Sequence, residues 1–377
     1  MTDTKMIDNG VWKADMRSAV EAVDGVLSHA ALLGASDVHI DPRIGSTAVR
    51  MRMDGQLEHV GSLPKKIHDE LISRLKILSG ARTDVHAVPQ DGRFRVNLAG
   101  ASYNVRISFM PTYHGENAVL RLLPSASAAK DSFASLGFTP EHVARIGKAL
   151  EANNGLILVT GPTGSGKTTT LRVCLSLKAS QPLSVMTLED PVEYEVPGVR
   201  HVHIRHAYGV TFASALRSAL RQDPDVIMVG EIRDNETAAT AISTALTGHL
   251  VLSTLHTTSA VDTLVRLADM GVAGYLTAAT IRLVISQRLV RMTCRVCDGT
   301  GDECQTCRGS GFLGRSVIAE VLPIDDRLRE MIARGDATQS IREHILSQGF
   351  QPMAYDADEK VDWGVTTRAE TISAMSS

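Results

Sequence analysis

Apolar residues in the first third of the chain follow two spacings, one typical of helices and one typical of strands. Helical spacing occurs in two runs, 16–33 and 64–78, and Gly34 ends the first of them. Short strand-like runs lie at 38–40, 48–53, 57–60, 94–98 and 103–107. Asp54-Gly55 is typical of a hairpin turn. Because strands and helices do not alternate regularly here, we predict a small α+β domain over residues 1–123.

The pattern changes in the second part of the chain to near-continuous apolar strands separated by amphipathic helices. Thr139 and Pro140 have the residue types of a helix start. The predicted strands are 155–160, 185–188, 226–229 and 250–255. Strands that are apolar on both faces indicate a parallel sheet covered by helices on both sides. We therefore predict an α/β domain over 136–377 after a linker at 124–135, with a mostly helical region at 323–377.

The composition is that of an ordinary globular protein. Of the 377 residues, 44% are hydrophobic and 21% are charged, and the formal net charge of −3 provides no basic field for nucleic acid. Segment 1–16 is polar, without the apolar core of a signal peptide, and no apolar stretch reaches the roughly 18 residues of a membrane span. We therefore expect a cytoplasmic protein whose membrane contact is peripheral and runs through protein partners.

A glycine-rich sequence directly follows the first predicted strand of the α/β domain. Residues 161–168 read Gly-Pro-Thr-Gly-Ser-Gly-Lys-Thr and precede a helical run. Glycines allow backbone torsions that let successive N–H groups surround phosphates at the start of a helix. In this pattern the lysine reaches the phosphates and the hydroxyl of Thr168 ligates Mg²⁺. The residues predicted to bind a nucleoside triphosphate here are Gly161, Pro162, Thr163, Gly164, Ser165, Gly166, Lys167, Thr168 and Thr169.

Acidic residues follow two of the other predicted strands. Glu231 comes after 226–229, and Glu189 directly follows 185–188. Parallel strands bring their carboxyl ends to the edge that holds the phosphate loop. Glu231 is therefore a candidate to orient the attacking water, and Glu189 to hold Mg²⁺ through water. The alternatives are a surface or helix-capping glutamate at 231 and a turn-forming Asp190-Pro191 pair.

Histidines flank the last of the predicted strands. His256, at its carboxyl end, is placed to sense the γ-phosphate. A buried histidine satisfied by hydrogen bonds is the alternative for it and for His249. His201, His203 and His206 alternate along a further strand-like run. The first two share a face without a third ligand at suitable spacing, so we do not predict a metal site there.

Four of the five cysteines are crowded into a short segment. They form two C-x-x-C pairs, each followed by x-Gly-x-Gly. Without an export signal such pairs indicate a metal site rather than disulfides, and four thiolates suit a tetrahedral zinc. A redox role is the weaker interpretation, because no thioredoxin-like βαβ pattern surrounds the pairs. We predict a zinc-binding arm at 292–314 with the ligands Cys294, Cys297, Cys304 and Cys307, and a buried thiol at Cys174.

Together these motifs resemble one family, the ATPases that power type II secretion and type IV pilus assembly. The matching segments, similar to the family's Walker A, Asp, Walker B and His boxes, are 161–170, 188–194, 221–234 and 247–257. The resemblance extends over nearly the whole chain. It implies a RecA-like P-loop core with a mostly parallel sheet, preceded by a smaller α+β, PAS-like domain and carrying a small zinc-binding arm.

The same resemblance implies roles for individual residues. Those implied for catalysis are Glu231, Lys167, His256, Arg106 and Arg121. The two arginines match family arginines that reach the nucleotide phosphates from the N-terminal domain, and such a guanidinium contributes about 10³–10⁵ in rate. Glu189 belongs to the acidic box near Mg²⁺. The implied cofactors are ATP, Mg²⁺ and Zn²⁺, and the implied partners are five further copies in a homohexamer and an inner-membrane platform protein.

We therefore expect an ATP-hydrolysing hexameric motor that powers assembly of a type IV pilus or a type II secretion pseudopilus. One alternative is a retraction ATPase of the same superfamily, although those relatives generally lack a cysteine arm. The other, from a different class, is a RecA-like nucleic-acid translocase, which fits the same phosphate loop. The acidic balance and the lack of a basic aromatic groove argue against it, and we expect no nucleic-acid partner.

Overall fold

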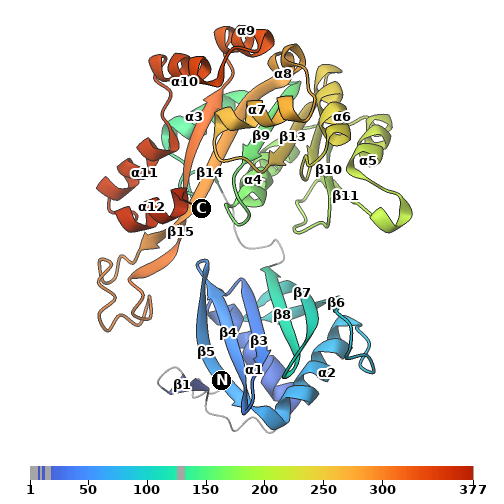
Figure 1. Ribbon diagram of the computed structural model, residues 1–377, viewed down its shortest axis with the longest axis vertical. Coiled ribbons are helices and arrows are strands. Elements are labelled where there is room, and N and C mark those ends of the chain that lie inside the picture. The colour runs from blue at the N-terminus through green and yellow to red at the C-terminus, as the bar shows by residue number, and fades with distance from the viewer. Residues whose placement is uncertain (1–6, 9–10, 13–17, 125–131, 377) are drawn as a thin grey trace. The chain divides into compact units, whose positions relative to one another are not determined.

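The computed structural model describes residues 7–8, 11–12, 18–124 and 132–376. The chain divides into two compact units, Met1–Ala128 and Ala129–Ser377, whose elements are labelled in Figure 1. Within the described residues, no helix combines the length and the apolar character that crossing a membrane requires.

The first unit is built on a six-stranded antiparallel sheet with the order β5-β4-β3-β8-β7-β6. Its strands are β3 (Asp37–Pro42), β4 (Ser46–Met53), β5 (Gln56–Pro64), β6 (Gln90–Leu98), β7 (Ala101–Thr112) and β8 (Gly115–Pro124), and a separate pair is β1 (Ile7–Asp8) and β2 (Val11–Trp12). The helices α1 (Ala19–Leu32) and α2 (His68–Ser79), the latter preceded by the 3₁₀ turn η1 (Lys65–Ile67), share one hydrophobic core with the sheet. The sequence pattern did not predict β8, which lies inside the sheet between β3 and β7.

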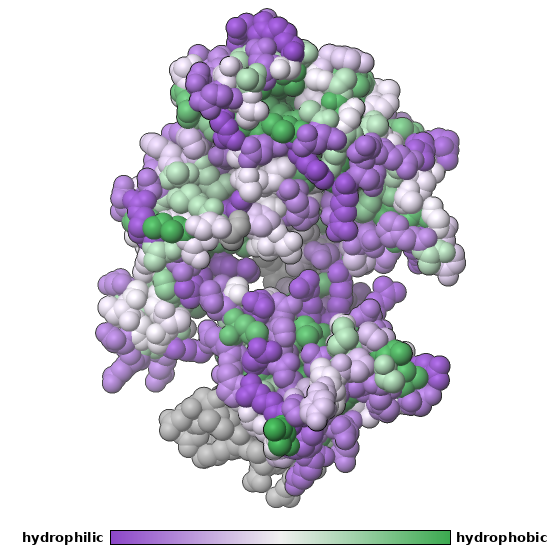
Figure 2. Space-filling model, viewed as in Figure 1, coloured by the Kyte–Doolittle hydropathy of each residue, from purple (hydrophilic) through white to green (hydrophobic). Residues whose placement is uncertain are grey.

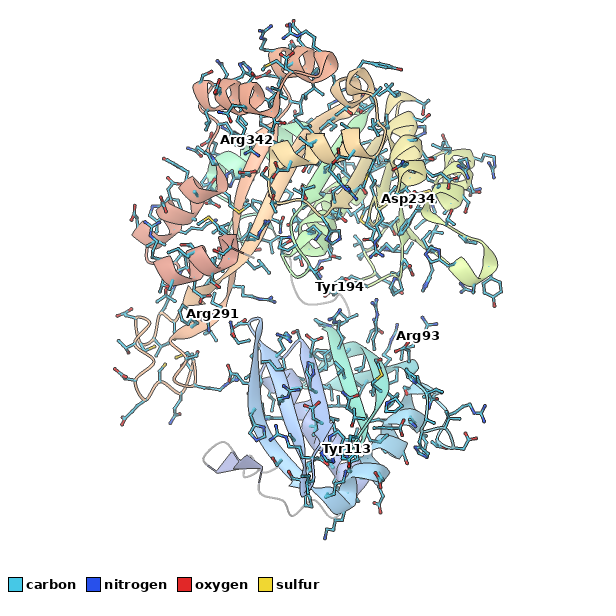
Figure 3. All side chains as sticks on the ribbon, viewed as in Figure 1. Arg93, Tyr113, Tyr194, Asp234, Arg291 and Arg342 are labelled. Carbon is cyan, nitrogen blue, oxygen red and sulfur yellow. The ribbon has the colours of Figure 1, made fainter. Side chains whose placement is uncertain are left out.

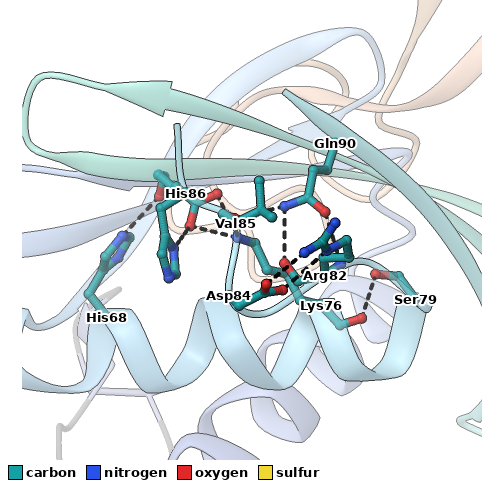
Figure 4. A network of polar contacts seen from close by, with 9 residues as sticks. His68, Lys76, Ser79, Arg82, Asp84, Val85, His86 and Gln90 are labelled. Carbon is teal, nitrogen blue, oxygen red and sulfur yellow. Dashed lines mark hydrogen bonds and ion pairs between the residues drawn. The ribbon is translucent and has the colours of Figure 1, made fainter. Parts of the chain in front are cut away.

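A buried polar network ties the α2–β6 loop to this sheet (Figure 4). Lys76 of α2 is fully buried, and its ammonium lies 2.7 Å from Oε1 of Glu116. The ammonium also donates to the carbonyl of Val85 at 2.6 Å, and Nδ1 of His86 lies 2.6 Å from Oε2 of Glu116. Gln90 donates to the same Val85 carbonyl at 2.8 Å. Because losing one member of a buried ion pair costs about 3–5 kcal/mol, the network holds the loop in one conformation.

The second unit holds a seven-stranded sheet with the order β11-β10-β12-β13-β9-β14-β15. Its strands are β9 (Gly155–Thr160), β10 (Val185–Glu189), β11 (Val199–His203), β12 (Val226–Val229), β13 (Leu250–Leu255), β14 (Ile281–Thr293) and β15 (Phe312–Pro323). All neighbours pair in parallel except β14 and β15, so the predicted mostly parallel sheet is confirmed. The antiparallel β14–β15 hairpin was not predicted, and the cysteine arm connects its two strands.

Helices cover both faces of this sheet and form a separate core on each (Figure 1). One face carries α3 (Pro140–Leu150) and α4 (Lys167–Ala179). The other carries α5 (Phe212–Ala219), α6 (Asn235–Leu246), α7 (Ala260–Asp269), α8 (Gly274–Thr280), α9 (Asp326–Arg334) and α10 (Thr338–Ser347). Two 3₁₀ turns, η2 (His206–Tyr208) and η3 (Leu220–Gln222), flank α5. Figure 2 shows the strongly hydrophilic outer surface at α9, whose sequence is rich in arginine and acids.

Local sequence signals begin and end these helices. Thr139 caps α3 by accepting a hydrogen bond from the backbone N–H of His142 at 3.2 Å. Phe133, which lies within the expected linker, is buried beside the ring of Phe138. Cys174 of α4 is fully buried as predicted, and this burial raises the pKa of its thiol to about 12.

The last two helices, α11 (Met353–Asp362) and α12 (Arg368–Met375), pack against the β14–β15 hairpin. Arg291, near the end of β14, forms an ion pair with Glu370 of α12 at 2.6 Å. Its guanidinium carbon lies 4.2 Å from the ring centroid of Phe312 at the start of β15. Figure 3 labels Arg291 where the hairpin leads into the cysteine arm. These contacts fix the base of the cysteine arm, because a bidentate arginine pair and a stacked ring both restrict the guanidinium.

Candidate functional site

The glycine-rich loop connects β9 to α4 at the carboxyl edge of the parallel strands. Gly161, Gly164 and Gly166 have φ angles of +145°, +82° and +87°, which side chains rarely tolerate. A Cβ at Gly161 would stand 2.4 Å from the carbonyl oxygen of Gln287, so the close approach of the two backbones requires glycine. Gly166 is the N-cap of α4 and offers no side chain to its first-turn N–H groups. That helix start is therefore open to an anion.

Lys167 begins α4, is buried, and donates to the carbonyls of Gly161 at 2.7 Å and Pro162 at 2.9 Å. Burial lowers the pKa of Lys167 to about 8, against the opposing effect of Glu231. Oγ of Ser165 is also buried, and among the described residues it has no hydrogen-bond partner. A desolvated ammonium and an unpaired hydroxyl beside a helix start are the groups that a triphosphate would satisfy.

The three threonines of the loop occupy its outer positions. Thr163 and Thr168 are exposed, and Thr169 is partly buried. Thr168 lies in the first turn of α4, from which a hydroxyl can ligate Mg²⁺ beside a bound triphosphate. Together with the glycine torsions and the buried lysine, the loop fits ATP with Mg²⁺.

Gln287 of β14 supports the loop from the side, and the sequence pattern did not single it out. The side chain is fully buried; Nε2 donates to the carbonyl of Ser165 at 2.7 Å, and Oε1 accepts from Oγ1 of Thr170 at 2.8 Å. Gln287 thus fixes both the loop and the first turns of α4. The available signal was a polar Ser-Gln-Arg run at 286–288 inside an apolar segment.

Arg288, the next residue of β14, was also not predicted as a site residue. It is 5% exposed and donates to the carbonyls of Gln287 at 3.0 Å and Thr258 at 3.2 Å. Burial lowers the pKa of Arg288, with Glu320 acting in the opposite direction. Arg288 also lowers the pKa of Lys167. Lys167 and Arg288 therefore lie close enough for their charges to interact.

Glu231 follows β12, and its side chain is 18% exposed. Its Oε2 lies 2.6 Å from Nε of Arg233 and 3.6 Å from Nε2 of His256. Burial lowers the pKa of His256, Lys167 lowers it further, and Glu231 opposes both effects, so the imidazole is neutral at pH 7. The structure therefore brings the carboxylate and the imidazole together beside the phosphate loop. His249 precedes β13 and lies at the opposite edge of the sheet.

Two neighbouring acids at the end of β10, Glu189 and Asp190, each contact a histidine. Glu189 ends the strand and is 7% exposed, and its Oε1 accepts from Oγ1 of Thr187 at 2.6 Å and from Nδ1 of His201 at 2.9 Å. Oδ2 of Asp190 lies 3.1 Å from Nε2 of His206. Glu189 is thus held at the carboxyl edge of the sheet, beside β12, as a ligand near Mg²⁺ requires.

Arg106 and Arg121 lie in the first unit, directly opposite each other on β7 and β8. Arg93 on β6 pairs in register with Arg106, and Asp37 on β3 pairs with Arg121, whose Nε lies 2.9 Å from Oδ1 of Asp37. Like charges directly opposite each other, as in this arginine row, destabilise a sheet, and Asp37 offsets part of this repulsion at Arg121. Arg93 was not predicted, because its place in the row follows from strand register and not from sequence spacing.

The four clustered cysteines meet between β14 and β15. Their sulfurs all lie within 4.8 Å of one another, with Sγ–Sγ distances of 3.9 Å for Cys294–Cys304 and 3.6 Å for Cys297–Cys307. A tetrahedral zinc with Zn–S bonds of about 2.3 Å places its sulfurs about 3.8 Å apart, whereas a disulfide bond is about 2.05 Å long. The N–H groups of Gly301 and Gly311 donate to Cys297 and Cys307 at 3.4 and 3.3 Å. The cluster therefore fits zinc.

Replacing Cys304 by serine is expected to remove the metal. Purified wild-type protein should contain about one zinc per chain, since four thiolates form one closed site. Cys304→Ser should contain close to none after dialysis, and Cys174→Ser, which changes a cysteine outside the arm, should keep the metal. Metal analysis by mass spectrometry measures both. A zinc-free wild-type protein that is folded and active would overturn the assignment.

The parallel sheet, its phosphate loop and the acid and histidine beside that loop define a P-loop ATPase. The sequence model of the family described as "Type II/IV secretion system protein" matches residues 13–373, and the chain belongs to this family. Its homologues are secretion and pilus-assembly ATPases.

Two relatives and two solved structures illustrate the similarity. The chain is 41% identical to the type II secretion system protein HxcR of Pseudomonas aeruginosa, over 95% of this chain and 77% of that protein. It is 39% identical to the type IV pilus assembly ATPase PilB of Thermus thermophilus, over 95% of this chain but 43% of PilB. The structure of the ATPase DotB of Legionella pneumophila matches with a TM-score of 0.76 and 25% identity, over 98% of each chain. The pilus retraction motor PilT with bound ADP matches with a TM-score of 0.67 and 27% identity, over 93% of this chain and 96% of PilT.

Proposed function

We propose that this ATPase is the motor for assembly of a type IV pilus or a type II secretion pseudopilus, acting as a hexamer on an inner-membrane platform protein at the cytoplasmic face. The observation that carries the catalytic part is the meeting of Glu231 and His256 beside the phosphate loop, with Oε2 and Nε2 3.6 Å apart. A protein that binds a nucleotide without hydrolysing it does not need a carboxylate and an imidazole beside the buried Lys167.

In the proposed reaction each residue has one task. The loop N–H groups and Lys167 bind the β- and γ-phosphates, and Gln287 keeps the loop in shape. Thr168 would ligate Mg²⁺ and Glu189 would lie beside it, and the ion when bound would neutralise charge at the phosphates. Glu231 accepts a hydrogen bond from the attacking water and orients it, while the neutral His256 donates to oxygen on the γ-phosphate side.

The arginine row supports a coupling between hydrolysis and movement of the first unit. We infer that Arg106 and Arg121 deliver positive charge to the transition state, in a ring whose subunits close around the nucleotide. Like charges held opposite each other by strand register are stabilised when an anion binds them, which is what a transferring phosphoryl group provides. Hydrolysis would then require the two units to approach, and phosphate release would let them separate.

Assembly is favoured over retraction by the cysteine arm and by the named relatives. Four of the proteins at 36–41% identity are described as secretion or pilus-assembly proteins. PilT, the retraction motor, supports the fold and the shared ATPase site at 27% identity. A nucleic-acid translocase remains the alternative from another class, and the formal net charge of −3 argues against it.

Co-purification tests the motor proposal directly. Affinity-tagged full-length protein expressed with the inner-membrane components of its host should retain a polytopic platform protein, and that protein should stimulate ATP hydrolysis. Single- and double-stranded DNA should leave the rate unchanged. Stimulation by DNA together with indifference to the platform protein would replace the motor proposal with the translocase.

A further inference from the structure

The carboxylate of Glu189 is held from one side only. Both of its hydrogen bonds converge on Oε1, one from the hydroxyl of Thr187 and one from Nδ1 of His201. Within the described part of the chain, Oε2 accepts no hydrogen bond. A carboxylate with one oxygen fixed and the other open is oriented toward a further ligand, as metal-bound carboxylates commonly are.

His201 reaches Glu189 because of the parallel pairing of β10 and β11. In that register Thr187 lies opposite His201, so both side chains stand on the same face of the sheet and converge on the end of β10. The side chains are nearly enclosed, with exposed fractions of 12% for His201 and 9% for Glu189. A hydrogen bond between them is therefore shielded from competing water.

The backbone fixes the tautomer of the imidazole. The N–H of Val196 donates to Nε2 of His201 at 3.0 Å, so Nε2 is the acceptor nitrogen. The proton then resides on Nδ1, which lies 2.9 Å from Oε1 of Glu189 and 2.9 Å from Oγ1 of Thr187 and donates toward both. The hydroxyl of Thr187 likewise donates to this oxygen, since the ionised carboxylate has no proton to give. His201 is thus a fixed donor with one orientation.

We propose that His201 is a positioning residue that aims Glu189 at the Mg²⁺ of the bound nucleotide. The inference rests on the proposed function, in which Mg²⁺ and ATP occupy this edge of the sheet. Glu189 interacts with the metal or its water shell through Oε2, and His201 and Thr187 hold Oε1 so that Oε2 keeps its direction. Losing an outer-shell partner of this kind costs about 10–100-fold in metal affinity.

Binding of a fluorescent ATP analogue, titrated with Mg²⁺ and repeated in EDTA, tests this role without measuring turnover. His201→Ala should raise the Mg²⁺ concentration for half-maximal effect by about 10–100-fold, while affinity in EDTA stays unchanged. His201→Gln keeps a donor and an acceptor and should recover most of the Mg²⁺ response. Thr187→Val should act in the same direction with a smaller effect. His203→Ala, on the same strand, is the matched control and should behave as the wild type.

Two outcomes would overturn the inference. One is an unchanged Mg²⁺ response in His201→Ala. The other is an equal loss of nucleotide affinity with and without Mg²⁺, together with a lower melting temperature, which would show that the imidazole only ties the backbone at Val196 to the sheet. Failure of the proposed function looks different, because wild-type protein would then bind no nucleotide in either condition.

Discussion

Alanine at position 167 is expected to abolish ATP hydrolysis, with a loss of at least about 10²–10³-fold in rate. The variant removes the buried ammonium that now donates to the carbonyls of Gly161 and Pro162. Because burial has already lowered the pKa of Lys167 to about 8, the site holds a cation whose hydration is largely lost and which gains most from a phosphate. Nucleotide affinity should therefore fall with the rate. Steady-state phosphate release and equilibrium binding of a fluorescent nucleotide measure the two effects.

Lys178, at the other end of the same helix, provides the matched control. It is also buried, and burial lowers its pKa, yet it lies away from the phosphate loop. Lys178→Met should leave nucleotide binding and turnover near the wild-type values. Equal losses of activity in both variants would mean that the helix is destabilised as a whole. Normal turnover in Lys167→Ala would show that the phosphate loop is not part of the catalytic site.

Glutamine at position 231 is expected to reduce turnover by about 10²–10⁴-fold while leaving ATP binding intact. The amide keeps the shape of the side chain, but it loses the negative charge that accepts from water. The two variants therefore separate nucleotide binding from hydrolysis, since Lys167→Ala is expected to lose both and Glu231→Gln only hydrolysis. The affinity of Glu231→Gln for ATP should match that of the wild type within about twofold, because the contacts that bind the ground state are preserved. It is measured under conditions of negligible hydrolysis.

Glu236 is the matched control for this charge change. It is an exposed glutamate in the first turn of α6, and its Oε1 lies 3.1 Å from the guanidinium of Arg217. Glu236→Gln should hydrolyse ATP at the wild-type rate. Undiminished turnover in Glu231→Gln would show that another residue orients the attacking water.

The extent to which the fold was predictable depended on how the polar residues are arranged within each strand. The strands β9, β10, β12 and β13 have near-continuous apolar sequences, and the pattern predicted all four. In β14, Ser286, Gln287 and Arg288 interrupt the apolar run although all three are buried. Their burial is possible because each finds a hydrogen-bond partner in a segment far away in the sequence, at Thr258 for Ser286 and Arg288 and at Ser165 for Gln287. The spacing of residues in the sequence does not reveal those partners.

The candidate site residues also differ in whether a local sequence motif or the sheet pairing brings them to the site. Lys167 and Glu231 were predicted because each is part of a local motif at the end of a strand. Gln287 and Arg93 were not, because sheet pairing and register bring them to their places. His201 is intermediate: its alternation with His203 was visible, and we did not predict a metal site from it. Its contact with Glu189 arises only from the parallel register of β10 and β11.

The β14–β15 hairpin joins the phosphate loop to the cysteine arm with a single stiff element. Gln287 contacts the loop, and the arm begins where β14 ends at Thr293. The intervening length is about 20 Å at roughly 3.3 Å per residue. The antiparallel partner strand and the Arg291–Glu370 ion pair oppose bending over that length. A rotation of about 3° at the loop would therefore displace the base of the arm by about 1 Å.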